Sequence, residues 1–228
     1  MKWLNKLERK FGNIYISNLM LYIVVGTLIV YIFAYLFPDL PILYYLGFDR
    51  DAIFSGQVWR ILTFILEPYS DSPVFMLLSC YFYWMIGSEL ERAWGGFRFN
   101  LFYFVGVLGT IIGGLITGFA SCHFLNLSLF LAYAAIFPDT RFMLFFIIPV
   151  KAKYIAYVDA AFLAIQFLFY IRIGLWPYSL VILIAFVNFF LFFGSIFFRK
   201  VRDHFKYRKV RKNFRSQIQM SRRDDDDE

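Results

Sequence analysis

The stretch from Asn18 to Phe37 reads NLMLYIVVGTLIVYIFAYLF and decides the class of this protein. It is about twenty residues long and has no charged side chain, which is what an α-helix needs to cross the roughly 30 Å hydrocarbon core of a bilayer. A basic segment precedes it, but the apolar run is too long for a signal peptide and lacks a small-residue cleavage site. We therefore expect a retained first transmembrane helix.

Further apolar stretches follow along the chain, which has 228 residues, 61% of them hydrophobic and 23% aromatic. Soluble domains are only roughly 45–50% apolar, so much of this surface must face lipid. The further stretches are Pro73–Ser88, Phe99–Phe119, Phe124–Phe137, Tyr154–Ile171 and Tyr178–Phe198. The fold class predicted is an all-α membrane protein with six transmembrane helices.

The distribution of basic residues predicts the topology, because Lys and Arg accumulate in cytoplasmic segments. With both termini cytoplasmic, all 23 Lys and Arg residues lie inside except Arg50, Arg60 and Arg172. An odd number of helices would separate the two basic ends of the chain. The sequence thus divides into a basic cytoplasmic N-terminus (1–17), a membrane domain (18–198) and a basic cytoplasmic tail with an acidic end (199–228). In a bacterium this places the protein in the cell membrane.

The first external segment, from Pro38 to Ser72, is apolar but broken by Pro, Gly and Asp. Tyr44, Tyr45, Trp59 and Tyr69 suit the membrane–water interface, where amphipathic rings are favoured. We expect a large, structured loop that lies partly in this interface.

The charged ends indicate which partners to expect. A nucleic-acid-binding face is not expected, because the basic residues are concentrated in the two ends. The tail has an apolar residue about once per helical turn, which predicts an amphipathic helix on the anionic inner leaflet. A disordered tail that only enforces topology is the alternative. Cys80 and Cys122 have no metal-ligand spacing, and we expect no metal and no cofactor.

Two motifs carry a resemblance to a known family. Trp59-Arg60 lies in the first external segment, and Gly87, Glu91 and Gly95 form a G-x-x-x-E-x-x-x-G pattern where the second helix ends. With the stretch Ile148–Lys153, which reads IPVKAK, these motifs occur in the order typical of rhomboids. The chain resembles the rhomboid superfamily, which implies a six-helix bundle in which these residues are structural.

The same resemblance implies where a catalytic dyad belongs, and the dyad is missing. Rhomboid proteases use a GxSG serine at the start of the fourth helix and a histidine in the sixth. This chain has two histidines, His123 and His204, and neither lies in the sixth stretch. A serine needs a base within hydrogen-bond reach to become a nucleophile. We therefore expect no catalytic residues and a pseudoprotease, similar in this respect to the derlins.

The similarity to derlins implies a protein that binds transmembrane clients and aids their quality control or trafficking. Membrane lipids are its other expected partners. Two alternatives stay open. One is an intramembrane serine protease with a non-standard active site built on Ser128 or Ser121. The other is a small transporter with a polar path along Asp159 and Asn188.

Polar residues at membrane depth are functional candidates by default. Asn126, Asp159 and Asn188 are the candidates for a polar intramembrane or client-binding site, and Gln166 is a further polar group there. We also expect Arg60 to pair with Glu67 or Asp71. Glu91 is expected to satisfy backbone N–H groups or to pair with Arg92 or Arg98. The glycines from Gly106 to Gly118 predict close helix packing inside the bundle rather than dimerisation.

Overall fold

The computed structural model describes residues 2–144 and 148–194. Met1–Leu191 form one compact unit, and the second unit begins at Phe192. The helices are α1 (Lys2–Phe11), α2 (Leu19–Leu36), α3 (Ile42–Leu46), α4 (Arg50–Phe54), α5 (Arg60–Thr63), the 3₁₀ helix η1 (Phe64–Leu66), α6 (Pro73–Trp94), α7 (Gly96–Thr117), α8 (His123–Ile136) and α9 (Ala152–Arg172). A further helix, Trp176–Gly194, is called the 176–194 helix below. The strands are β1 (Arg141–Leu144) and β2 (Ile148–Lys151).

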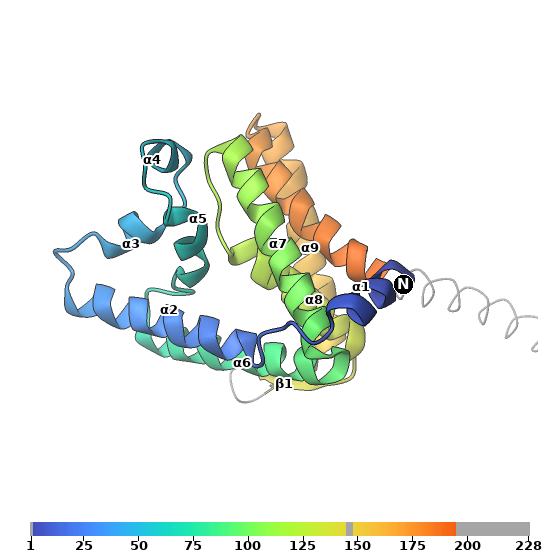
Figure 1. The fold of residues 1–228 in the computed structure, drawn as a ribbon. Coiled ribbons are helices and arrows are strands. Elements are labelled where there is room, and N and C mark those ends of the chain that lie inside the picture. Colours follow the sequence, from blue (N-terminus) through green and yellow to red (C-terminus); the bar gives the residue numbers. More distant parts are fainter. Residues whose placement is uncertain (1, 145–147, 195–228) are drawn as a thin grey trace, which may run out of the picture. The chain divides into compact units, whose positions relative to one another are not determined.

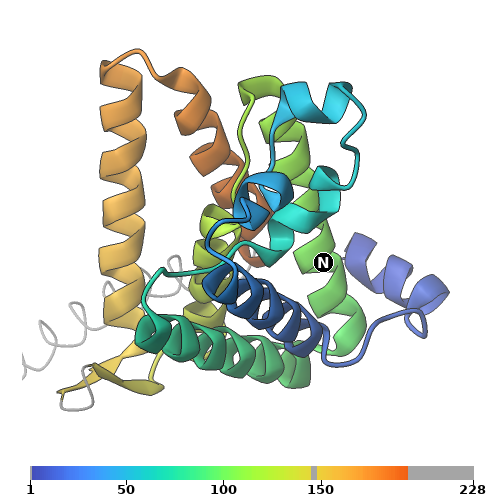
Figure 2. The same ribbon diagram turned by 90° about the vertical axis from the view of Figure 1, so that its left-hand side faces the viewer.

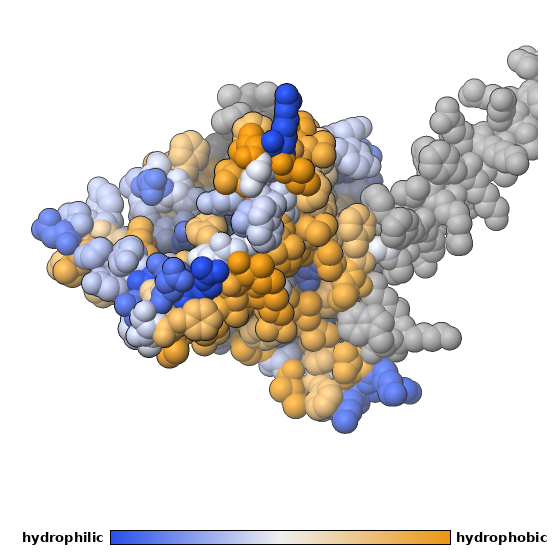
Figure 3. All heavy atoms as spheres, turned by 90° about the horizontal axis from the view of Figure 1, so that it is seen from above, coloured by the Kyte–Doolittle hydropathy of each residue, from blue (hydrophilic) through white to orange (hydrophobic). Residues whose placement is uncertain are grey.

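Four of these helices are long and apolar enough to cross a membrane: α2, α7, α9 and the 176–194 helix. Large apolar side chains also cover much of the surface, as Figure 3 shows for one face. Such a surface is stable in lipid and not in water. The protein is therefore a mostly helical integral membrane protein, as the sequence predicted. The other two predicted spans are also helices, but α8 has only 14 residues and α6, with 22, carries Glu89, Glu91 and Arg92 near its end.

Helices α2 and α6 lie side by side and run in opposite directions (Figures 1 and 2). At one end the backbone N–H of Asn18, which precedes α2, donates to Glu91 Oε1 of α6 over 2.9 Å. At the other end, Tyr31 Oη of α2 donates to the carbonyl oxygen of Asp71 over 2.9 Å, just before α6 begins. The pair is thus fixed at both ends.

The glycines of α7 allow the 176–194 helix to pack closely against it. A Cβ added to Gly109 or Gly113 would lie 2.8 or 2.6 Å from the side chain of Ile184. At Gly106 an added Cβ would meet Leu125 of α8 and lie 2.7 Å from Asn188 Nδ2. The prediction of close packing inside the bundle is therefore confirmed for these glycines.

A two-stranded antiparallel hairpin occupies the segment between α8 and α9, where the sequence suggested only a loop. Arg141 is opposite Lys151, and Phe142 is opposite Val150. The ring of Phe142 packs on Phe82 of α6 and on Tyr133 of α8, with centroid distances of 5.3 and 5.6 Å. The hairpin therefore ties the middle of α6 to the end of α8.

The N-terminal segment, predicted only as a basic end of the chain, contains the helix α1, which packs on the rest of the protein. Leu4 is only 3% exposed. Glu8 accepts from Arg98 near the start of α7, with Arg98 Nε to Glu8 Oε2 at 3.0 Å. The predicted tail (199–228), its contact with the inner leaflet and the end of the sixth stretch lie outside the described residues.

Candidate functional site

Arg60, the charged half of the Trp-Arg motif, is the most deeply buried charged residue of the described chain, with 1% of its surface exposed. Its Nη1 donates to the carbonyl oxygens of Tyr44 and Gly47 over 2.6 and 2.9 Å, and its Nε donates to Gln57 Oε1 over 2.7 Å. The guanidinium also lies 5.1 Å from the centre of the Tyr44 ring. The prediction that Arg60 pairs with Glu67 or Asp71 is wrong, because main-chain carbonyl oxygens of the loop accept its hydrogen bonds instead.

Trp59 and Thr63 complete the same arrangement. Trp59 Nε1 donates to the carbonyl oxygen of Tyr45 over 3.1 Å, and Thr63 Oγ1 donates to that of Leu46 over 2.8 Å. A short helix such as α3 leaves its last carbonyls without intrahelical partners. The segment Trp59–Thr63 supplies those partners, so this motif holds α3 against α5.

The second motif joins α2, α6 and α7. A Cβ at Gly87 would lie 2.5 Å from Met20 of α2, so glycine is what lets these two helices approach closely. Of the two predicted alternatives for Glu91, the hydrogen bond with a backbone N–H is the one observed, since Glu91 Oε1 accepts from the N–H of Asn18. Arg92 pairs with Glu89, and Arg98 pairs with Glu8. Gly95 has φ +90°, a conformation that favours glycine, and it joins α6 directly to α7.

No hydroxyl in the described chain is arranged with an imidazole. Ser128 is 1% exposed, and its Oγ donates to the carbonyl oxygen of Leu125 over 2.7 Å. Ser121 Oγ donates to Glu67 Oε2 over 3.0 Å. The ring of His123 contacts Phe124 and makes no hydrogen bond with the residues described. Among residues 2–144 and 148–194, the geometry therefore offers no serine that is activated by an imidazole.

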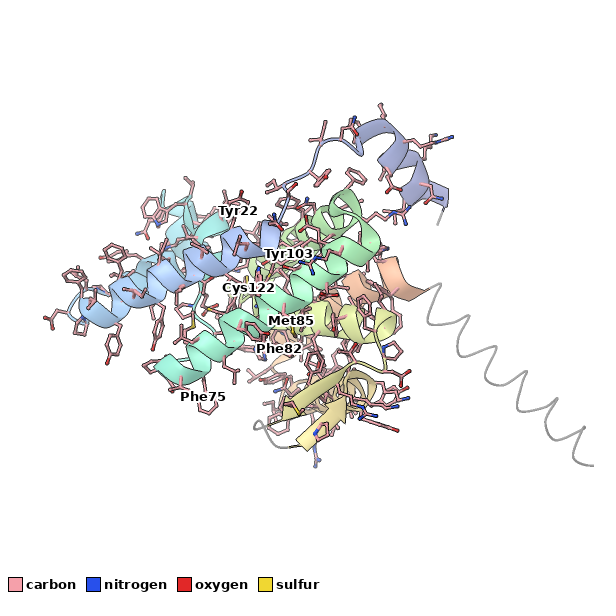
Figure 4. The ribbon with its side chains drawn as sticks, turned by 90° about the horizontal axis from the view of Figure 1, so that it is seen from below. Tyr22, Phe75, Phe82, Met85, Tyr103 and Cys122 are labelled. Carbon is pink, nitrogen blue, oxygen red and sulfur yellow. The ribbon has the colours of Figure 1, made fainter. Side chains whose placement is uncertain are left out.

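A cluster of buried polar groups that sequence reasoning missed surrounds the start of α8. Cys122 is 3% exposed, and burial raises the pKa of its thiol, with Glu67 adding to the effect. Burial also raises the pKa of Glu67, while the hydrogen bond from Ser121 lowers it. Figure 4 shows Tyr103 of α7 and Cys122 in the interior, whereas Tyr22 and Phe75, which are 64% and 58% exposed, point outward. A thiol with a raised pKa is a poor nucleophile.

The predicted polar residues at membrane depth are buried or partly buried, and they lie on three different helices. Asn126 of α8 is 2% exposed, and Asn188 of the 176–194 helix is 4% exposed. Neither amide atom of Asn188 has a hydrogen-bond partner among the described residues, and the same holds for Asn126 Oδ1. On α9, the buried oxygens Asp159 Oδ2 and Gln166 Oε1 also lack a donor within the described part of the chain.

A groove runs between α9 and the 176–194 helix. Its volume is about 700 Å³. Its walls are almost entirely apolar and include Phe167 and Leu168 from α9 and Leu183 and Val187 from the facing helix. Asp159 and Gln166 lie about two helical turns apart on one side of α9, and neither of them lines this groove.

The structure thus places the predicted residues in three separate groups. Trp59 and Arg60 organise the loop between α2 and α6, and Gly87, Glu91 and Gly95 organise the α2–α6–α7 junction. Asn126 and Asn188 are buried, and Asp159 is partly buried. Across residues 2–144 and 148–194, no three His, Cys, Asp or Glu side chains gather in a way that would hold a metal ion. No family model matches the chain, and no curated protein matches its sequence.

Proposed function

We propose that this protein is a non-catalytic, rhomboid-like membrane protein that binds transmembrane helices of client proteins along α9 and aids their quality control or trafficking. In this proposal all six apolar helices cross the membrane and both termini are cytoplasmic. The observation that carries it is the pair of unsatisfied acceptors on α9, Asp159 Oδ2 and Gln166 Oε1.

An acceptor without a donor is costly at membrane depth, because lipid offers no hydrogen bond in exchange. Asp159 and Gln166 are on the same side of α9 as Leu163, which is 1% exposed, so they face the bundle and not the bulk lipid. A client helix that packs into the interface between α9 and the bundle, and that carries a hydroxyl, amide or ammonium donor, would satisfy them. Client helices that need such help are partly polar and pack poorly in pure lipid.

The packing of α9 supports the same proposal. Only 11% of its most apolar stretch is buried, against 28% for α2, 44% for the 176–194 helix and 50% for α7. The apolar groove beside it, lined by Phe167 and Val187, has room for the large side chains of an incoming helix. A helix that is this open has surface to offer a partner.

The absence of a serine–imidazole pair among the described residues favours binding without cleavage. Ser128 is held by a main-chain carbonyl, and Ser121 is held by Glu67. In a Ser–His arrangement the serine hydroxyl donates to an imidazole, and a third group orients that imidazole. Ser121 donates to the carboxylate of Glu67 instead, so it does not have this geometry.

A photocrosslinking experiment tests the proposal. The photoreactive p-benzoylphenylalanine replaces Phe167 in the groove or, as a matched control, Tyr22, which is 64% exposed on α2. The purified protein is mixed in lipid with two model single-span helices, one of Leu and Ala only and one with a central Asn. We expect a crosslink from position 167 to the Asn-containing helix, loss of that crosslink on Asp159→Leu, and lipid adducts alone from position 22.

Equal crosslinking of both helices, or equal yields from positions 167 and 22, would rule out client recognition by α9. Cleavage of either helix in the same mixture, abolished by Ser128→Ala, would instead establish the protease alternative.

A further inference from the structure

The hairpin of β1 and β2 has an outward face that the proposed client binding does not use. Side chains alternate between the two faces of a strand. Phe142 faces the bundle, where its ring packs on α6 and α8. Arg141 and Met143, its two neighbours on β1, therefore lie on the opposite face, and both are exposed. Their partners on β2, Lys151 and Pro149, lie on that outward face too, because paired residues share a face.

Three cations gather where this face meets α9, and one carboxylate pairs with two of them. Asp139 Oδ1 lies 3.0 Å from Lys151 Nζ and 3.1 Å from Lys153 Nζ, so a single oxygen holds both ammonium groups close together. Arg141 lies directly opposite Lys151 in the register, and it has no acidic partner among residues 2–144 and 148–194. Like charges at opposite positions of a hairpin repel each other. Three cations against one carboxylate leave an excess of positive charge that an anion would neutralise.

Helix α9 places this cluster at a membrane surface. Strand β2 leads directly into α9, and the N–H of Ala152 donates to the carbonyl oxygen of Thr140 over 2.8 Å, so the hairpin is fixed to the first turn of the helix (Figure 2). With 21 residues, α9 is about 30 Å long, which matches the hydrocarbon core. Lys153 lies in its first turn and Arg172 in its last. Because charged side chains avoid the core, the surface of a bilayer that α9 crosses passes near Lys153.

Apolar and aromatic side chains surround the cations. Met143, on the outward face, is 64% exposed. Tyr154 and Tyr157, in the first turns of α9, are 56% and 66% exposed, and Lys153 Nζ lies 5.5 Å from the centre of the Tyr154 ring. Tyrosine rings favour the headgroup region of a bilayer, and cations attract its phosphates. The combination therefore fits a lipid better than a soluble anion.

From these features we infer that the outward face of the hairpin, together with the start of α9, binds the headgroup of an anionic phospholipid. Phosphate oxygens accept hydrogen bonds from Arg141, Lys151 and Lys153, and an acyl chain contacts Met143. The acidic end of the chain, residues 224–228, has a suitable charge, but it offers no apolar group to Met143 or Tyr154. The site lies outside the groove of α9, so it does not depend on client binding.

Native mass spectrometry of the full chain in detergent tests this inference with two probe lipids of equal chain length. Phosphatidylglycerol carries one net negative charge and phosphatidylcholine carries none. We expect phosphatidylglycerol to bind at least about tenfold more tightly, because each cation near the surface strengthens binding by about fivefold. Glycerol phosphate, the soluble headgroup at equal concentration, should not displace it, because it lacks the acyl chains. Equal binding of the two lipids, or displacement by glycerol phosphate, would overturn the inference.

Charge variants separate this site from non-specific attraction. The double variant Arg141→Gln/Lys151→Gln should weaken phosphatidylglycerol by about tenfold or more and leave phosphatidylcholine unchanged. Lys153→Gln, which lies outside the strands, should weaken phosphatidylglycerol by about fivefold. The matched control, Lys6→Gln/Arg9→Gln, removes the same two kinds of charge from exposed positions on α1 and should leave both lipids unchanged. Equal losses in the hairpin and α1 double variants would overturn the inference.

Two further variants identify what occupies the face. Met143→Ser should weaken phosphatidylglycerol by about threefold, because the apolar contact with the acyl chain is lost. Neutralising the acidic end, with Asn at positions 224–227 and Glu228→Gln, should leave phosphatidylglycerol binding unchanged. A gain of about tenfold in the neutralised variant, absent when Arg141→Gln/Lys151→Gln is added, would show that the acidic end covers the face, and would overturn the inference.

Discussion

The buried polar groups near α2 and those on α9 differ in the hydrogen bonds that they make. Arg60 and Glu91 are each tied to main-chain atoms of a distant segment, 16 residues away for Tyr44 and 73 for Asn18. Asp159 and Gln166 on α9 have buried oxygens with no donor in the described chain. Burying a polar group costs free energy unless it is hydrogen-bonded. Arg60 Nη2 and Glu91 Oε2 also lack a partner in the described chain, so the two regions differ in that Arg60 and Glu91 each make at least one hydrogen bond that fixes the fold. The proposed client site needs the open acceptors of the second region.

The largest effect on stability is expected at Arg60, whose side chain makes three hydrogen bonds. Arg60→Ala removes a buried cation and leaves the carbonyls of Tyr44 and Gly47 without donors. The expected loss is about 3 kcal/mol of unfolding free energy, measured by titration with SDS in mixed micelles. Arg50→Ala is the control, since Arg50 forms an exposed pair with Asp51 and should change stability by less than about 0.5 kcal/mol. Similar losses for the two variants would show that the buried carbonyls find other donors.

A smaller effect is expected at the crossing of α2 and α6. Gly87→Ala puts a methyl group 2.5 Å from Met20, and overpacking of this kind costs about 2 kcal/mol. The same unfolding assay should show that Met20→Ala restores part of this loss when the two changes are combined, because Met20→Ala removes the clashing atoms. Strictly additive effects of the two changes would mean that the residues do not contact.

The next effect depends on pH. Because burial raises the pKa of Glu67, its favourable contribution is present below its unfolded pKa of about 4.3 and is lost as the pH rises through the folded value. Glu67→Gln keeps an acceptor for Ser121 but does not titrate. Wild type and variant should therefore be equally stable near pH 4, with the variant becoming the more stable of the two toward neutral pH. A constant difference across this range would place Glu67 in water.

The smallest effect is expected at Asn188, on the 176–194 helix. Asn188→Leu replaces an amide without described partners by an apolar side chain of similar size, which should change stability by less than about 0.5 kcal/mol. Thermal unfolding in detergent is a sufficient measurement. A loss of about 2 kcal/mol or more would show that the Asn188 amide is hydrogen-bonded, and a missing partner in the described chain would then be no sign of an open site.

The sequence predicted the helices well because lipid leaves a strong compositional signal. The first span was expected from Asn18 to Phe37, and α2 runs from Leu19 to Leu36. The second was expected to end at Ser88, yet α6 continues to Trp94. Charged side chains such as Glu91 end an apolar stretch without ending a helix, because a helix can continue beyond its apolar part. The hairpin was missed because a short apolar run such as 142–150 has no periodicity that separates strand from loop.

The partners of the polar residues were less predictable. Arg60 was expected to find a carboxylate, but it finds carbonyl groups, which every residue carries and composition cannot reveal. The hydrogen bond from Asn100 was missed for the same reason, since its acceptor is the main chain of Ile16. A signal was present at Gly96, next to the glycine of the motif, because consecutive glycines at the start of a helix often mark close approach of another segment.

The link between Asn18 and Glu91 has a consequence for biogenesis. The chain must lengthen by 73 residues after Asn18 before Glu91 exists to receive its N–H. At about 5–20 residues per second, a ribosome needs roughly 4–15 s for this. Throughout that interval the first span stays in the bilayer, or beside the insertion machinery, without a complete α6, which ends at Trp94. The α2–α6 pair therefore assembles late, and a nascent chain halted before residue 91 should remain accessible to chaperones and proteases that longer chains escape.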